Sequence, residues 1–122
     1  MEESKQYEIN IIIGDSVVPA ILYANPTTDD FFSLLPLELK LDDYASTEKL
    51  CYLPRKLSTK DAPSGYNPSI GDITYYAPWG NLALFYKDFG YAEGLIHLGK
   101  VESGMDMFKT SSSLHVRIEF RK

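Results

Sequence analysis

The chain has 122 residues, of which 44% are hydrophobic and 24% are charged, with a formal net charge of -5 and a pI near 4.9. This composition is typical of a globular protein and argues against disorder, while the length suits one compact core. We therefore expect a single domain over residues 1–122, with residues 1–6 as a flexible N-terminus.

The distribution of charged and apolar residues argues against two classes of partner. The 12 basic residues are scattered along the chain, whereas phosphate binding needs local positive charge, so we expect no nucleic-acid partner. No apolar run approaches the roughly 18 residues of a spanning helix, and the polar first residues form no signal core. We expect a soluble, cytoplasmic protein, and export of a longer precursor stays open.

The N-terminal part of the chain predicts a hairpin. Apolar residues alternate over residues 7–13, and Gly14-Asp15 supplies a turn before a second strand at residues 17–23. Pro19 has no amide donor, so the second strand should be an edge there or carry a bulge.

A short helix should follow the hairpin. Asn25 is a good N-cap residue, and Pro26 suits the first helical turn. Phe31 and Leu35 would lie on the buried face, and Pro36 ends the helix because its ring cannot continue the hydrogen-bond ladder.

Two further strands and a long loop come next. Residues 37–42 alternate between leucine and charged residues, which predicts a half-buried strand, and residues 48–53 form its expected partner. The segment 58–69 is rich in Ser, Pro and Gly, and its length makes it a candidate functional loop.

The centre of the chain predicts a second hairpin. Residues 73–77 and 81–86 are rich in strand-forming residues and flank Pro78-Trp79-Gly80, in which Gly80 should take the positive φ of a three-residue loop. If Ala77 pairs with Asn81, Ile73 and Phe85 share one face. Both faces are apolar, so we expect both to be covered.

The remaining elements complete a barrel. We expect a strand at residues 94–101, a helical turn at residues 103–108 and a closing strand at residues 114–120 whose apolar side chains, Phe120 included, point inward. About eight short strands in so short a chain favour a mainly β fold closed into a barrel, with one short α-helix and a helical turn. The predicted core consists of Ile9, Ile11, Ile13, Phe31, Leu35, Leu39, Leu41, Ile73, Phe85, Ile96, Val116 and Ile118.

Few residues match the pattern of a catalytic or metal-binding site. His115 should face solvent, and His97 could bind a metal only with a carboxylate partner, so we expect no metal and no cofactor. Asp72 should accept backbone amides at the turn before Ile73. Cys51, the only cysteine, should be a small core residue.

Aromatic residues are the better candidates for binding. Trp79 sits at a turn tip, where it either contacts a ligand or packs on a neighbouring loop such as residues 58–69. We expect a groove bordered by Tyr66, Trp79 and Phe85 together with that loop.

Several motifs resemble a known family. Residues 98–105, LGKVESGM, resemble the F-G-K-V-x-x-G-M segment of cyclophilins. Small bacterial cyclophilin-like domains, most of unknown function, are the closer match through Asn25-Pro26-Thr27, Leu35-Pro36-Leu37, Tyr52-Leu53-Pro54, residues 71–78 and residues 80–83. The resemblance covers about residues 7–120 and implies a closed β-barrel with a helix.

The chain departs from the catalytic cyclophilins at the residues that isomerise prolyl bonds. The F-H-R motif is missing, although Arg55 follows Leu53-Pro54, and the G-S-Q-F-F segment is replaced by residues 80–84, GNLAL. Our first hypothesis is therefore a non-catalytic module that binds a small molecule or peptide in a groove of Tyr66, Trp79, Leu82, Phe85 and Arg55. The alternatives are a prolyl isomerase that uses Arg55 as its cation, and an accessory or homo-oligomeric unit.

Overall fold

The computed structural model describes residues 6–110 and 112–121. The expected flexible segment 1–6 lies outside the described residues except for Gln6, which already belongs to a strand. The elements are β1 (Gln6–Ile13), β2 (Ser16–Tyr23), α1 (Pro26–Phe32), β3 (Leu37–Tyr44), β4 (Glu48–Tyr52), β5 (Gly65–Tyr66), β6 (Asp72–Tyr76), β7 (Asn81–Phe85), β8 (Ala92–Glu93), β9 (Leu95–Val101), the 3-10 helix η1 (Met105–Phe108) and β10 (Leu114–Phe120).

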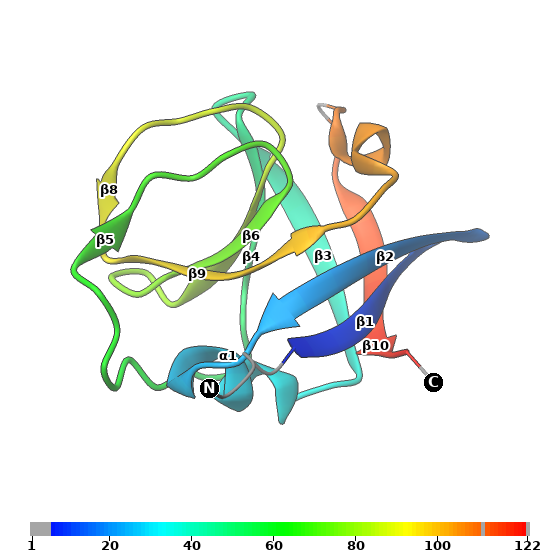
Figure 1. Ribbon diagram of the computed structural model, residues 1–122. Coiled ribbons are helices and arrows are strands. Elements are labelled where there is room, and N and C mark those ends of the chain that lie inside the picture. Colours follow the sequence, from blue (N-terminus) through cyan, green and yellow to red (C-terminus); the bar gives the residue numbers. More distant parts are fainter. Residues whose placement is uncertain (1–5, 111, 122) are drawn as a thin grey trace.

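Eight of the described strands close into an antiparallel barrel in the order β1-β10-β3-β4-β7-β6-β9-β2 (Figure 1). The short strands β5 and β8 pair with each other outside the barrel, on the left in Figure 1. The prediction of a closed barrel of about eight strands with one α-helix and a helical turn is therefore confirmed.

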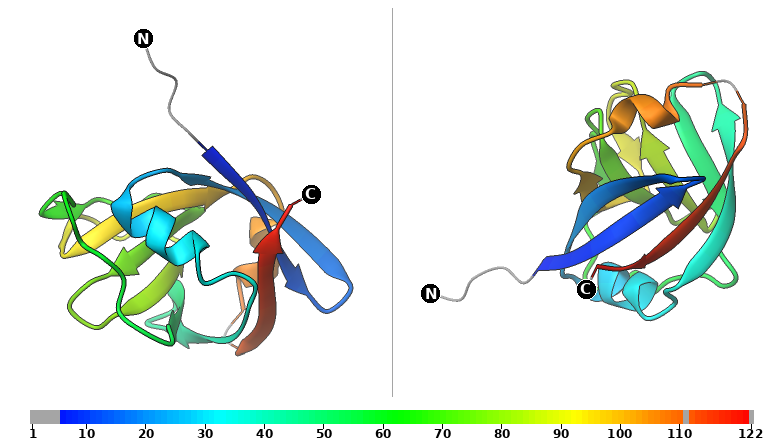
Figure 2. Two further views of the ribbon diagram at one scale, coloured as in Figure 1. Left: turned by 90° about the horizontal axis from the view of Figure 1, so that it is seen from below. Right: turned by 90° about the vertical axis from the view of Figure 1, so that its right-hand side faces the viewer.

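Helix α1 lies across one end of the barrel (Figure 2). Its start is fixed as predicted, because the side chain of Asn25 accepts a hydrogen bond of 2.8 Å from the amide of Thr28 and Pro26 occupies the first turn. Phe31 is fully buried and joins the interior cluster. A helix of seven residues has little stability alone, so this packing holds it in place.

The interior of the barrel is filled by aliphatic and aromatic side chains. Buried members of this cluster include Ile9, Ile11, Val18, Leu22, Phe31, Leu41, Ile73, Tyr75, Leu82, Leu84, Ile96, Leu98, Phe108, Val116 and Ile118. Cys51 is buried as expected, and burial together with the charge of Asp42 raises the pKa of its thiol to about 12.

Four of the side chains predicted to point inward do not reach full burial. Ile13, Leu39 and Leu114 are half-buried, and Phe120 is 43% exposed because it lies at the end of β10, where its ring packs 4.8 Å from that of Phe32. Pro19 lies at the end of the pairing of β2 with β9, which covers residues 20–22 of β2, and its carbonyl accepts from the amide of Glu102 at 2.9 Å. The amide that Pro19 lacks is therefore missing only at the margin of this ladder.

The register of β6 and β7 corrects the predicted central hairpin. Tyr76, not Ala77, is paired with Asn81, so the loop has four residues, 77–80. This shift of one residue reverses the faces. Ile73 shares the interior face with Leu84, while Phe85 points outside the barrel.

Two other expectations for this hairpin are confirmed. Gly80 has a φ of +69°, in the left-handed region that favours glycine. Both faces are covered, since Leu82 and Leu84 are buried inside the barrel and Phe85, only 2% exposed, is buried outside it in a second cluster with Ala83 and Leu95.

A candidate ligand pocket on the outer face of the barrel

A pocket of about 230 Å³ lies on the outer face of the barrel, over strands β4, β7, β6 and β9. The 77–80 turn and the segment that leads from β7 to β8 border it. We call it the aromatic pocket. It is lined by Tyr44, Glu48, Tyr76, Trp79, Asn81, Phe85, Phe89, Ala92 and Leu95.

Aromatic rings form most of its walls. The ring of Trp79 meets those of Tyr76 and Tyr44 edge-on, with centroids 5.4 Å and 6.0 Å away. Phe89 packs at a tilt, 5.8 Å from Phe85. Such rings give a large apolar surface of fixed shape, which suits the binding of a small apolar group.

Glu48 brings a carboxyl group into these apolar surroundings. It begins β4 directly opposite Phe85 of β7, so the two side chains leave the sheet on the same face. Burial raises the pKa of Glu48 to about 7. Among the described residues, none donates a hydrogen bond to its carboxylate or pairs with its charge.

Asn81 adds a polar group farther along β7. Its side chain is 1% exposed, and its amide nitrogen donates to the carbonyl of Leu82 at 3.2 Å. Its Oδ1 has no hydrogen-bond partner among the described residues. Since buried acceptors are nearly always paired, Oδ1 is an exception: it is an inaccessible polar atom beneath the apolar lining.

The structure brings only part of the predicted groove together. Trp79 and Phe85 both line the aromatic pocket. Leu82 is fully buried inside the barrel, on the opposite face of β7. Tyr66 packs behind the pocket against the cluster of Phe85 and Leu95 but does not line it.

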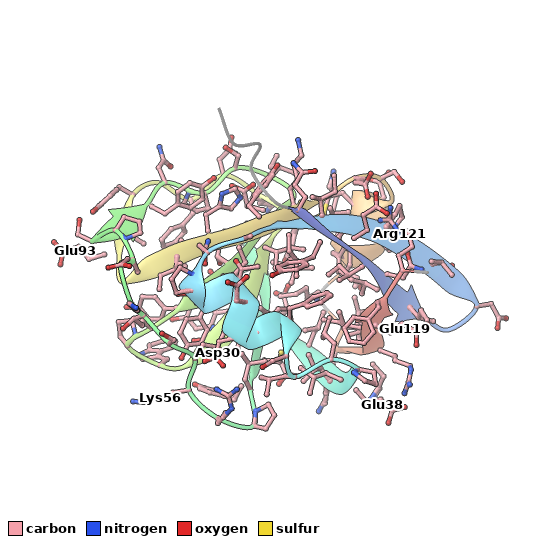
Figure 3. The ribbon with its side chains drawn as sticks, turned by 60° about the horizontal axis from the view of Figure 1, so that its bottom comes forward. Asp30, Glu38, Lys56, Glu93, Glu119 and Arg121 are labelled. Atoms are coloured by element: carbon pink, nitrogen blue, oxygen red, sulfur yellow. The ribbon has the colours of Figure 1, made fainter. Side chains whose placement is uncertain are left out.

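Arg55 lies at the α1 end of the molecule and is engaged there. Its Nη1 and Nη2 donate to Oδ2 and Oδ1 of Asp30 at 2.9 Å and 2.7 Å, and Nη1 also donates to the carbonyl of Lys56. Figure 3 shows Asp30 on α1 and Lys56 on the loop beside it. The Arg55 guanidinium and the amide of Ser58 lower the pKa of Asp30. Arg55 does not line the aromatic pocket.

The sequence predicts that Trp79 either contacts a ligand or packs on a neighbouring loop such as residues 58–69, but its ring contacts are with Tyr44 and Tyr76 instead of that loop. Its ring is 48% exposed and lies between Tyr44 and Tyr76 at the mouth of the aromatic pocket. Trp79 is therefore positioned to contact any molecule that enters.

A second set of polar contacts lies around the carboxylate of Asp72. Its Oδ2 accepts the Ser69 amide, as predicted for this turn, and also the Tyr66 hydroxyl at 2.6 Å. Its Oδ1 lies 3.3 Å from Nε2 of His97, whose ring stacks on Tyr66 at 4.5 Å. Burial opposes the charge of Asp72, but His97, Tyr66 and the Ser69 amide together lower its pKa.

The Asp72–His97 contact supplies the carboxylate that a metal site at His97 would need. Over residues 6–110 and 112–121, however, no three His, Cys, Asp or Glu side chains are grouped so as to hold a metal ion. His115 is exposed on β10 as predicted. The contacts of Asp72 join β5, β6 and β9, and we assign them a structural role.

Sequence reasoning did not identify the two polar lining residues, Glu48 and Asn81, or the rings of Tyr44, Tyr76 and Phe89. No local signal marked Glu48, because its place beside Phe85 depends on the pairing of β4 with β7, which only the fold shows.

Comparisons with known proteins bear on the fold. The solution structure of the hypothetical protein AF2241 from Archaeoglobus fulgidus is similar, with a TM-score of 0.69, 16% identity and 98% of each chain covered. At that identity the likeness concerns the fold alone. A search of curated proteins finds no match.

Within the described part of the chain, no helix is long and apolar enough to cross a membrane. The profile of the Cyclophilin-like family matches residues 11–119, which is most of the chain. This match agrees with the resemblance seen in the sequence motifs and with the closed barrel. The chain belongs to the Cyclophilin-like family.

Proposed function

We propose that this protein is a non-catalytic binding module whose aromatic pocket takes a small molecule. The observation that carries the proposal is the pocket itself, about 230 Å³ in volume and walled by aromatic rings. Glu48, which is half-buried and lines the same pocket, provides a polar group at which a ligand can be oriented. An apolar concavity with a few polar groups is typical of ligand sites in proteins.

The position of Arg55 supports this proposal over a prolyl isomerase. That chemistry needs a cation or donor aimed at the twisted amide inside an apolar pocket. The Arg55 guanidinium instead binds both oxygens of Asp30, away from the aromatic pocket. Fold alone does not carry the activity.

An accessory or oligomeric role would use the same apolar surface in another way. Tyr44, Trp79 and Phe89 are all more than a third exposed at the pocket, and a partner surface could cover them. The rings enclose a cavity rather than a flat patch, which favours a small ligand. Sedimentation of the protein at several concentrations separates the two proposals, because self-association would raise the apparent mass with concentration. Self-association through this face would also bury Trp79.

The test uses Trp79 as a built-in reporter, since it is the chain's only tryptophan. A panel of small aromatic and aliphatic compounds is titrated while Trp79 fluorescence and the amide resonances of a ¹⁵N-labelled sample are followed. We expect at least one class of compound to shift the fluorescence and the resonances of lining residues together, in a saturable way.

The matched variants are Phe89→Ala and Phe120→Ala. Both rings are exposed, at 54% and 43%, but only Phe89 lines the aromatic pocket. Phe89→Ala should weaken binding several-fold and Phe120→Ala should leave it unchanged. Equal losses in the two variants, or no saturable shift with any compound, would count against the proposal.

A further inference from the structure

We propose that the aromatic pocket selects protonated organic amines, with Glu48 as the counter-charge and the rings as the site of the attached apolar group. This inference rests on the proposed function and adds the class of ligand.

The pocket carries one unpaired charge. Of the described residues that line it, Glu48 alone carries a formal charge, and it has no cationic partner there. Glu48 is half-buried, and removing an unpaired carboxylate from water is costly. An ammonium group on a ligand would supply the missing charge, whereas an anionic ligand would meet repulsion from the same group.

The aromatic rings of the pocket suit a cation that carries an apolar substituent. At the mouth, the ring of Trp79 makes edge contacts with those of Tyr44 and Tyr76, and Phe85 lies beside Glu48 in the register of β4 and β7. Aromatic faces carry negative charge density and attract a cation within about 6 Å. The same rings also accept the apolar substituent of an amine, so both parts of the ligand find complementary surface.

The polar groups of the pocket lie toward its two ends. Glu48 lies opposite Phe85, and Asn81 lies four residues earlier on β7, so their backbones are roughly 13 Å apart at the rise of a strand. The pocket thus has a charged acceptor toward one end and the buried side chain of Asn81 toward the other, with aromatic rings between them. An amine with an apolar middle section matches this order of groups.

Binding should then depend on pH. Burial raises the pKa of Glu48 to about 7, so an ammonium ion must displace a proton from Glu48 below that pH. Tyr44 and Tyr76 are the other titratable residues of the described pocket lining. Alkylamines resemble lysine and stay protonated up to about pH 10, so affinity should rise between about pH 6 and pH 8.

The experiment uses three probes that share one ring and chain length: 2-phenylethylammonium, 2-phenylethanol and phenylacetate. Their dissociation constants are measured by calorimetry at about pH 8 with the wild type, Glu48→Gln and Glu93→Gln. Glu93 is the control because it is an exposed carboxylate next to Ala92 on β8, and Figure 3 shows it at the outer edge of that strand.

We expect the ammonium probe to bind the wild type roughly tenfold more tightly than the alcohol, and phenylacetate to bind least. Glu48→Gln should remove the preference for the ammonium probe while the alcohol still binds. Glu93→Gln should keep it. Near pH 6 the wild type should release protons on binding the amine, measured by repeating the titration in buffers of different ionisation enthalpy.

The failures of the two proposals are distinguishable. If the alcohol binds as well as the ammonium probe, or if Glu48→Gln retains the preference, the amine inference is wrong while the pocket remains a binding site. If none of the three probes binds and the wider panel also fails, both proposals are overturned. A folded Glu48→Gln protein is verified by its denaturation midpoint before the comparison is made.

Discussion

The Nζ of Lys49 lies 3.2 Å from Oδ1 of Asp43, and the Lys49 side chain is completely buried. The ammonium group also donates to the carbonyls of Thr110 and Ser112, and the Tyr86 hydroxyl donates to the same oxygen of Asp43. These contacts tie β3 and β4 to the segment between η1 and β10. The barrel end opposite α1 is therefore joined by a buried ionic network.

Replacing Lys49 should destabilise the protein strongly. Lys49→Met keeps the approximate length of the side chain but removes the donor of two carbonyls and the counter-charge of the Asp43 carboxylate, which keeps its hydrogen bond from Tyr86. Removing one partner of a buried pair typically costs about 3–5 kcal/mol. The free energy of unfolding in urea measures the loss.

Lys40→Met is the control for that substitution. Lys40 faces Asp42 at 3.8 Å with both side chains more than half exposed, and such pairs contribute less than about 1 kcal/mol. Similar losses for the two variants would show that the network around Lys49 has no special role.

The 77–80 turn gives a second prediction. Gly80→Val should destabilise the protein by more than about 1 kcal/mol, because a β-branched residue is strained at a φ of +69°. Gly80→Asn should cost less, since asparagine tolerates this region. Thermal melts of the two variants provide the comparison. Equal decreases in melting temperature would indicate that crowding by the added side chain, not backbone strain, causes the loss.

The cluster of Ala83, Phe85 and Leu95 on the outer face of the barrel should stabilise the protein as strongly as interior residues do. Phe85 is 2% exposed although it lies outside the barrel, and Phe85→Ala should cost roughly 3–5 kcal/mol in denaturant unfolding. A loss below about 1 kcal/mol would mean that the segment over this face does not hold the ring in solution.

Glu48 should make stability fall as pH rises. Its pKa in the folded protein is about 7, above the ordinary value of 4.5, so between these values the folded state binds more protons than the unfolded state. The contribution of the protonated carboxyl is complete below about pH 4.5 and is lost as pH rises through about 7.

The measurement compares wild type with Glu48→Gln in urea at about pH 5 and about pH 8. We expect Glu48→Gln to gain stability relative to wild type by of order 1 kcal/mol between the two pH values, a figure reduced for the solvent contact of the pocket. If the difference in unfolding free energy between the two proteins is the same at both pH values, water reaches the Glu48 carboxylate freely. Asp30, Asp43 and Asp72, whose pKa values are lowered, are common to both proteins and cancel.

Local signals in the sequence predicted the elements well, and the faces of β6 and β7 less well. Asn25 and Pro26 determine the start of α1 through contacts within one helical turn, so the sequence alone was sufficient there. The loop around Trp79 offered no local feature that distinguishes three residues from four. The face on which Phe85 lies depends on that single residue.

The candidate site was harder to predict because its parts come from distant segments. Glu48 meets Phe85 through pairing of β4 with β7, and Trp79 meets Tyr44 across more than thirty positions of sequence. Neither contact follows from periodicity. Arg55 could be found in the sequence, but only the fold shows that Asp30 engages it.

Strand β7 alternates between the two sides of the barrel wall, with Leu82 and Leu84 inside and Asn81, Ala83 and Phe85 outside. Inserting or deleting one residue within β7 would turn side chains that now fill the barrel interior to the outer face, and turn outer side chains to the interior. Substitution at the outer positions has no such effect. In proteins that share this barrel, substitutions at outer positions such as Asn81 should therefore be tolerated within β7, while length changes are confined to the connecting loops.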